Sequence, residues 1–154
     1  MDRLITAADN EFSKSWIKAI FQLRASIDRW AKENLQEIWE GQYQSRCIYL
    51  LLSIEKEGSK ASTLIKEHGI SKQAMSKILQ NLISLNLIDT RPDVDDQRSK
   101  LIFLTEKGST VLEKSLTAFS TLIYAFKESA DYGSMEESRN TLNLALRLIQ
   151  EYKK

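Results

Sequence analysis

The chain has 154 residues, of which 42% are apolar and 28% are charged, which predicts one globular domain over residues 1–154 rather than a disordered segment. A domain of this length can bury around 70% of the surface that its unfolded chain exposes. The formal net charge is only +1, and neither a long apolar run nor an export signal in residues 1–10 is present, which favours a cytoplasmic location away from any membrane.

Few residues suit catalysis or metal binding. His68 is the only histidine and Cys47 the only cysteine, which excludes an internal disulfide and argues against a zinc site or a Ser/His/Asp set. Without a glycine-rich phosphate loop either, the sequence predicts no enzyme, no metal and no cofactor. Paired carboxylates stay open as an alternative, but nothing in the sequence supports them.

These two residues have simpler roles. Cys47 begins an apolar run and is predicted to pack as a small hydrophobic side chain. The alternative is redox sensing, which needs a basic and partly exposed setting, and only Arg46 supplies charge nearby. His68 is predicted to lie at the surface, interacting with the carbonyl groups at the end of a helix.

Residues 10–39 are predicted to form a long amphipathic helix, or a helix with a short break. Its apolar side chains recur at four- and three-residue intervals and form one stripe: Trp16, Ile20, Leu23, Ile27 and Trp30. Gly41 interrupts this pattern. The next helix, residues 43–54, is apolar on most sides, which is typical of a buried element.

A helix-turn-helix is predicted in residues 61–85. A short helix over residues 61–67 is followed by Gly69, which can adopt the left-handed conformation that ends a helix. Ser71 can then cap the first amide groups of a second helix, residues 71–85.

The second helix of this pair has two distinct faces. Apolar residues recur at three- and four-residue spacing from Met75 to Leu85, which predicts a packed face. The opposite face carries amides, hydroxyls and a lysine without any carboxylate, a set that suits base edges and phosphates in a major groove. An ordinary solvated helix face is the alternative. The polar residues are Gln73, Ser76, Lys77, Gln80 and Ser84.

A β-hairpin is predicted next, with strands in residues 87–91 and 101–104 joined by a proline- and aspartate-rich turn. Asp96 lies two residues before Arg98, on the same side of an extended chain, and can hold its guanidinium in place. An arginine at the tip of a hairpin is well positioned for a narrow groove. The alternative is a surface ion pair that contributes ~0 to 1 kcal/mol. Together these elements predict a winged helix-turn-helix.

The sequence of residues 59–108 resembles the MarR family of bacterial transcription regulators. Asp93 and the triplet Asp96-Gln97-Arg98, followed by Leu104-Thr105-Glu106-Lys107-Gly108, are similar to the aspartate-rich turn, D-x-R and L-T-x-x-G of its wing. The sequence departs from the family at Val94, where proline is frequent, and at Asn86, where glycine is frequent. Asparagine also tolerates the left-handed conformation that ends a helix.

The resemblance implies a fold that is mainly α with a small β-hairpin wing. Residues 42–108 would form the DNA-binding lobe, flanked by dimerisation helices in residues 10–40 and 109–154. Arg98, oriented by Asp96, would reach the minor groove or its phosphates. The DNA-binding residues implied in this way are Ser71, Lys72, Gln73, Ser76, Lys77, Gln80, Asp96, Arg98 and Lys100.

Beyond the wing, Thr105 is predicted to cap a long helix, and Ser134 with Glu137 to form a capping box for a last one. The last helix is apolar over more than one face, which favours a partner, and the simplest partner is a second copy of the chain. The alternative is a monomeric helical bundle. The resemblance to the MarR family also implies a homodimer.

The predicted function is sequence-specific binding of a pseudo-palindromic DNA site by this homodimer, which regulates transcription. The resemblance further implies a small aromatic effector in a cleft, which Trp16, Trp30, Trp39 and Tyr43 could line, although such residues are more often core. Residues 59–107 carry eight basic and six acidic residues, a net charge of +2, which is a mild excess. The alternative is a winged-helix module that binds another protein through the same polar face.

Overall fold

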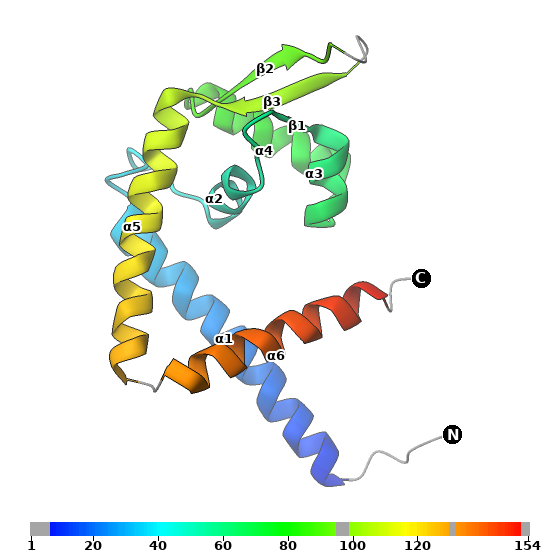
Figure 1. Cartoon of the computed structure of the whole chain (residues 1–154), viewed down its shortest axis with the longest axis vertical. Coiled ribbons are helices and arrows are strands. Elements are labelled where there is room, and N and C mark those ends of the chain that lie inside the picture. The colour runs from blue at the N-terminus through cyan, green and yellow to red at the C-terminus, as the bar shows by residue number, and fades with distance from the viewer. Residues whose placement is uncertain (1–6, 95–98, 130–131, 152–154) are drawn as a thin grey trace. The chain divides into compact units, whose positions relative to one another are not determined.

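The structure is a computed structural model of the chain, and it describes residues 7–94, 99–129 and 132–151. Figure 1 shows helices throughout the chain and three short strands near its middle. The elements are α1 (Ala7–Leu35), α2 (Ser45–Leu52), β1 (Ser59–Lys60), α3 (Ala61–His68), α4 (Lys72–Ser84), β2 (Ile88–Pro92), β3 (Lys100–Leu104), α5 (Glu106–Ser129) and α6 (Tyr132–Glu151). The predicted fold class, mainly α with a small β wing, is therefore confirmed. The chain divides into two compact units, Met1–Ser115 and Leu116–Lys154.

The core of the first unit is built around α2, which contacts both α1 and α4. Side chains from the end of α1 and from α2, α3, α4 and β3 meet there, and burying them supplies the main driving force for folding this unit. The fully buried apolar side chains include Leu35, Leu50, Leu51, Leu64, Met75, Leu82 and Ile102.

The wing is a three-stranded antiparallel sheet in the order β1-β3-β2. β2 and β3 form the predicted hairpin, in which Thr90 lies opposite Ile102. β1 was not predicted, because a strand of two residues leaves no alternating pattern in the sequence. It pairs with β3, where Ser59 also lies opposite Ile102. β1 directly precedes α3, so its pairing with β3 attaches the hairpin to the start of that helix.

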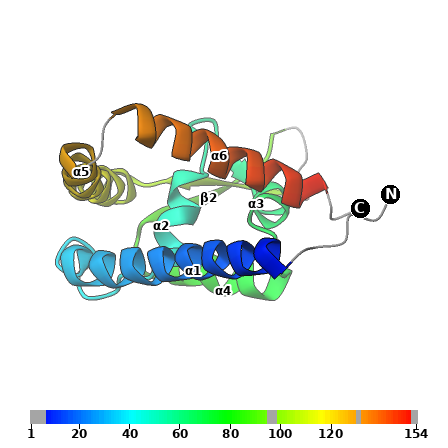
Figure 2. The same ribbon diagram turned by 90° about the horizontal axis from the view of Figure 1, so that it is seen from below.

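The long first helix ends earlier than predicted. α1 is unbroken from Ala7 to Leu35 (Figure 2), and residues 36–41 form turns in which the Gly41 amide donates to the Gln36 carbonyl at 2.7 Å. Gly41 has a φ of +78°, and Glu40 before it has a φ of +50°. A left-handed pair of residues cannot continue a right-handed helix, so α1 cannot run past residue 39, and Trp39 lies in the turns that follow it.

Trp39 and Tyr43 pack in the core just after this turn. Trp39 is 3% exposed, its ring meets that of Tyr43 edge to face with centroids 5.7 Å apart, and its Nε1 donates to Ser115 Oγ at 3.0 Å. Burial, together with the nearby carboxylate of Asp28, raises the pKa of Tyr43 to about 12. The two rings therefore fix the turn onto the start of α5, and the prediction that aromatic residues are core is confirmed for both.

The first turn of α5 is fixed by Thr105, as predicted. The Thr105 hydroxyl accepts a hydrogen bond from the Gly108 amide at 2.9 Å and donates one to the Asn86 carbonyl at 2.7 Å. Asn86 has a φ of +56°, the left-handed conformation expected of it. One hydroxyl thus caps α5 and attaches it to the residue that follows α4.

The second unit contains the later part of α5 and α6. The predicted capping box at Ser134 is wrong, because α6 already begins at Tyr132, so Ser134 lies inside its first turn rather than before it. Most of the apolar side chains of α6 are exposed, among them Leu144 at 50% and Leu146 at 58%. This unit therefore has a broad apolar surface.

Within the described part of the chain, no helix is both long enough and apolar enough to cross a membrane. The same residues contain no cluster of three or more histidine, cysteine, aspartate or glutamate side chains placed to hold a metal ion.

Candidate nucleic-acid interface

The turn between α3 and α4 has the geometry predicted from its residues. Gly69 takes the left-handed conformation, with φ +61° and ψ +32°, and its amide donates to the Ile65 carbonyl at 3.0 Å. The hydroxyl of Ser71 accepts a hydrogen bond from the Ala74 amide at 3.2 Å, so Ser71 is the N-cap of α4. These two local features end one helix and start the next within three residues.

α4 separates a packed face from a solvent face. Met75 and Leu82 are 1% and 0% exposed and contribute to the core of the first unit. The residues of α4 that are predicted to bind DNA lie on the other face. No carboxylate accompanies them, because α4 contains no acidic residue. All of them are exposed: Ser71, Lys72, Gln73, Ser76, Lys77 and Gln80. A polar, mildly basic helix face is thus presented to solvent.

The wing carries further cations on its strands. Lys100 is exposed at the start of β3, opposite Pro92 of β2. The Arg91 guanidinium carbon lies 4.7 Å from the centre of the Phe103 ring, a cation-π contact that supports the side chain along the sheet. Asp96 and Arg98, predicted to form the tip of the wing, lie outside the described residues, so their roles stay predictions.

Asp93 joins β1 to the residues that flank the turn of the wing. The sequence predicted only that it belongs to an aspartate-rich turn. Asp93 is 4% exposed, and its Oδ2 lies 2.7 Å from Lys60 Nζ and accepts a hydrogen bond from the Ser99 hydroxyl at 2.9 Å. Its amide also donates to the Ser99 carbonyl at 3.1 Å. Lys60 is distant in sequence, so no local pattern could have identified this pair.

We expect Asp93→Ala to lower the free energy of unfolding by about 1–2 kcal/mol, because it removes a buried acceptor and leaves the hydrogen bonds of its partners unmade. Urea unfolding measures this change. Asp89→Ala is the matched control, since Asp89 also lies on the wing but forms an exposed pair with Arg91 at 3.9 Å, worth about 0–1 kcal/mol. Equal losses in the two variants would contradict the role of Asp93.

Cys47 packs against α4, the helix that is predicted to enter the major groove. Its thiol is 0% exposed and accepts a hydrogen bond from the Asn81 amide of α4, with Nδ2 and Sγ 3.6 Å apart. Burial raises the pKa of the Cys47 thiol, although the hydrogen bond from Asn81 acts in the opposite direction. The prediction of a small buried side chain is confirmed, and a reactive thiolate is disfavoured.

We therefore expect a thiol reagent near pH 8 to label Cys47 in the native protein at least ~10-fold more slowly than in urea, because both burial and the raised pKa suppress thiolate attack. The time course of a disulfide-exchange reagent measures both rates on the same sample. Labelling of the native protein as fast as that of the unfolded protein would support the redox alternative instead.

His68 does not interact with the end of its helix as predicted. Its Nε2 lies 3.0 Å from the hydroxyl of Ser53, which follows α2, and its ring meets that of Tyr49 with centroids 4.5 Å apart. The prediction of a contact with helix carbonyls is wrong, because the packing of α3 on the end of α2 supplies a closer partner. The side chain holds these two helices together.

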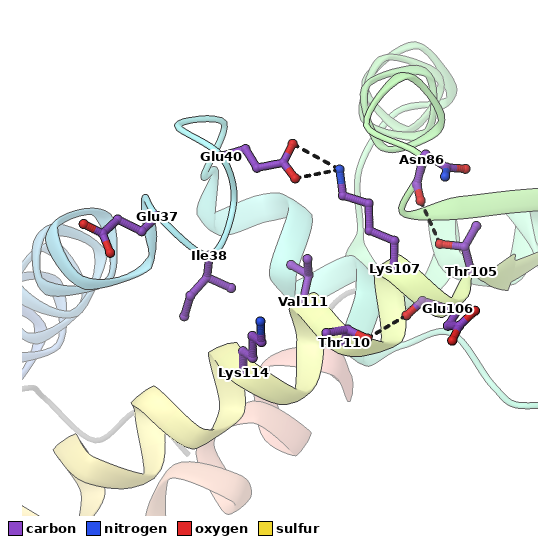
Figure 3. Close-up of a pocket in the computed structure, with 10 residues that line it drawn as sticks. All are labelled: Glu37, Ile38, Glu40, Asn86, Thr105, Glu106, Lys107, Thr110, Val111 and Lys114. Carbon is purple, nitrogen blue, oxygen red and sulfur yellow. Dashed lines mark hydrogen bonds and ion pairs between the residues drawn. The ribbon is translucent and has the colours of Figure 1, made fainter.

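A pocket of about 810 Å³ lies between the turn after α1 and the first turns of α5. Figure 3 shows Lys107 extending from α5 to Glu40 in that turn, where Nζ lies 2.9 Å from Oε1 and 3.1 Å from Oε2. The walls carry charges of both signs, since Glu37, Glu106 and Lys114 line it as well. The four aromatic residues predicted to line an effector cleft are absent from its lining.

The sequence comparisons match part of the chain and both point to transcription regulators. Residues 43–99 match the profile of the MarR family. The HTH-type transcriptional regulator PetP of Rhodobacter capsulatus is 38% identical over 60 residues, which make up 39% of this chain and 36% of that protein. The chain therefore matches about a third of the length of this curated relative.

The structural comparisons extend over nearly the whole chain. A Cys-to-Ser variant of MarR from E. coli in complex with operator DNA has a TM-score of 0.75 at 19% identity, covering 94% of this chain and 99% of that one. The complex of S. aureus MepR with DNA has a TM-score of 0.74 at 18% identity, covering 87% and 97%. At these identities the likeness concerns the fold alone.

Proposed function

Because the chain belongs to the MarR family of winged helix-turn-helix transcription regulators, we propose that it binds double-stranded DNA as a homodimer and so regulates transcription. The observation that carries the proposal is the solvent face of α4, which offers amides, hydroxyls and lysines without a carboxylate. DNA complexes of two proteins with a similar fold support it. The MarR family is one of regulators rather than enzymes, in keeping with the predicted absence of catalysis.

The homodimer is proposed from the apolar surface that each unit exposes. On α1 of the first unit, Phe12 is 70% exposed and Phe21 is 65% exposed. In the second unit, Tyr124, Leu146 and Ile149 are 64%, 58% and 60% exposed. Surfaces of this kind are covered in stable proteins, and a second copy of the chain is the simplest partner for each of them.

In this proposal one domain, residues 1–154, has two kinds of segment. Residues 42–108 form the DNA-binding lobe, and residues 10–40 and 109–154 form the dimer. The two copies of α4 enter successive major grooves of a pseudo-palindromic site, about one helical turn apart. The predicted contacts in each half-site come from Ser71, Lys72, Gln73, Ser76, Lys77, Gln80, Asp96, Arg98 and Lys100. A regulator of this kind acts in the cytoplasm, where the DNA is.

A small aromatic effector that changes DNA binding remains part of the proposal. Of the four aromatic residues predicted to line its cleft, Trp39 and Tyr43 are buried in the core, while Trp16 is 37% exposed. The mixed charges around the pocket in Figure 3 fit a polar ligand better than a purely apolar one. Titration of the tryptophan fluorescence with candidate phenolic acids tests this part, and no change with any of them would argue against it.

The wing is proposed to contact DNA through Arg98. We expect Arg98→Ala to weaken DNA binding. The far-ultraviolet circular dichroism and the oligomeric state by light scattering should stay those of the parent protein, because a residue predicted at the tip of a hairpin contributes little to the core. A fluorescence anisotropy titration with labelled duplex measures the affinity. Unchanged affinity would remove Arg98 from the interface.

A protein-binding module is the second candidate function. The formal net charge of +1 favours it, and so does Val94, an apolar side chain that is 93% exposed on the wing. The acidic character of the wing is weaker support than the sequence suggested, because Asp93 is buried against Lys60.

Selection from random-sequence duplexes at two salt concentrations, with light scattering of the same sample, separates the two functions. A dimeric regulator is expected to enrich a two-fold symmetric sequence. Its affinity should fall steeply as the salt concentration rises, because binding releases counterions from the DNA phosphates. A well-folded dimer that binds no duplex at low salt would favour the protein-binding module.

A further inference from the structure

A groove of about 600 Å³ runs along one flank of α4, between its first turns and the beginning of α2. It was not anticipated from the sequence, because residues from two separate helices form it. Its polar lining comes from Gln44 and Arg46 near the start of α2, and from Ser71, Gln73, Lys77 and Asn81 at α4.

The groove is positively charged. Arg46 and Lys77 line it, and no carboxylate does. Among the residues that the structure describes, neither cation forms an ion pair, whereas Lys60 and Lys107 of the same unit are each paired with a carboxylate. Two exposed, unneutralised cations on one groove attract an anion.

The position of Arg46 relative to α4 is fixed. The next residue in the chain, Cys47, is 0% exposed and accepts the hydrogen bond from Asn81 of α4. α2 and α4 also pack directly on each other in the core. The backbone that carries Arg46 therefore cannot shift along α4 without opening the core, so its side chain starts from a preorganised place.

The width of DNA indicates which anion fits. An α-helix with its side chains is about 10–12 Å across and fills a major groove about 12 Å wide. The phosphate strands that border the groove must then run along the two flanks of the helix, while the base edges lie in front of it. Arg46 extends from a flank, so it faces a strand of phosphates rather than bases.

We propose that Arg46 binds a phosphate of the DNA strand beside α4, with Lys77 on the other side of the same groove. The inference rests on the proposed function and deepens it, because it adds a residue from α2 to the predicted contacts. Its role is to fix the register of α4 in the major groove, independently of base sequence.

The test measures DNA affinity by fluorescence anisotropy for three proteins: the parent chain, Arg46→Ala and Arg29→Ala. Arg29 is the matched control, since it is an exposed arginine of α1 outside the groove, and its removal changes the net charge equally. Each protein is titrated with a selected site and with an unrelated duplex over a range of salt. Circular dichroism and light scattering verify that fold and dimer persist.

Arg46→Ala is expected to weaken binding to both duplexes equally and to reduce the slope of log K against log salt by about two for a dimer. The slope change corresponds to a loss of about 10- to 60-fold near 0.1 M salt. Arg46→Lys, which keeps a point charge, should retain most of the slope. Arg29→Ala should behave as the parent chain.

Binding by Arg46→Ala with the parent affinity and slope would overturn the inference, and so would a loss confined to the selected site with an unchanged slope. The parent chain separates this failure from a failure of the proposed function. If the parent binds no duplex, the regulator proposal itself fails, whereas a parent that binds normally leaves only Arg46 in question.

Discussion

Gly108→Ala is expected to lower the free energy of unfolding by about 3 kcal/mol, near the upper end of what overpacking costs. A β-carbon at this position would lie only 1.9 Å from the Leu87 carbonyl oxygen, which is backbone and cannot rotate away. The same carbonyl accepts a hydrogen bond from the Thr105 amide at 3.1 Å. Moving it would therefore disturb the connection between the end of α4 and the start of α5.

The sign of this effect makes it a sharp test. In an exposed helix, alanine is more favourable than glycine by about 1 kcal/mol, so helix propensity alone predicts a gain. Ser109→Ala, one residue further along α5 and exposed, is the matched control and should change stability little. Urea unfolding of both variants decides the matter, and a Gly108→Ala protein as stable as the parent would mean that α5 does not rest on Leu87.

The double variant Gln73→Ala/Lys77→Ala should lose DNA affinity by about 100-fold or more. Both side chains are exposed on α4, and a well-placed base contact is worth about 1–3 kcal/mol, to which the loss of a lysine-phosphate attraction adds. Because alanine is a good helix former, the free energy of unfolding should stay within about 0.5 kcal/mol of the parent value.

Anisotropy titrations with the selected duplex measure this loss, and Lys32→Ala provides the control. Lys32 is an exposed lysine in the last turn of α1, away from α4 in sequence. A double variant that binds as tightly as the parent chain, while Arg98→Ala is impaired, would move recognition from α4 to the wing. If neither change affects binding, the polar face of α4 is an ordinary solvated surface.

The helix-turn-helix could be predicted because its signals lie within a few residues. Gly69 and Ser71 determine where α3 ends and α4 begins through their own backbone and side-chain chemistry. The spacing of Met75 and Leu82 shows which face of α4 is packed, and the remaining face follows from it. The hairpin, Thr105 and Asn86 were predicted for the same reason.

The base of the wing could not be predicted, because its contacts join distant parts of the chain. Lys60 reaches Asp93, and β1 exists only because β3 offers it a partner. The groove containing Arg46 is similar, since a residue before α3 becomes a neighbour of α4 through packing of α2. An exposed arginine carries no mark in the sequence that distinguishes it from other surface cations.

The sequence by itself determined the order of the helices and the hairpin, the capped turn before α4 and the two faces of that helix, because periodicity and capping are properties of neighbouring residues. Only the tertiary structure decided that Asp93 is buried, that Gly108 must lack a β-carbon and that Arg46 lies beside α4. These features depend on which surfaces meet when the core closes, and side chains far apart in the chain become neighbours only then.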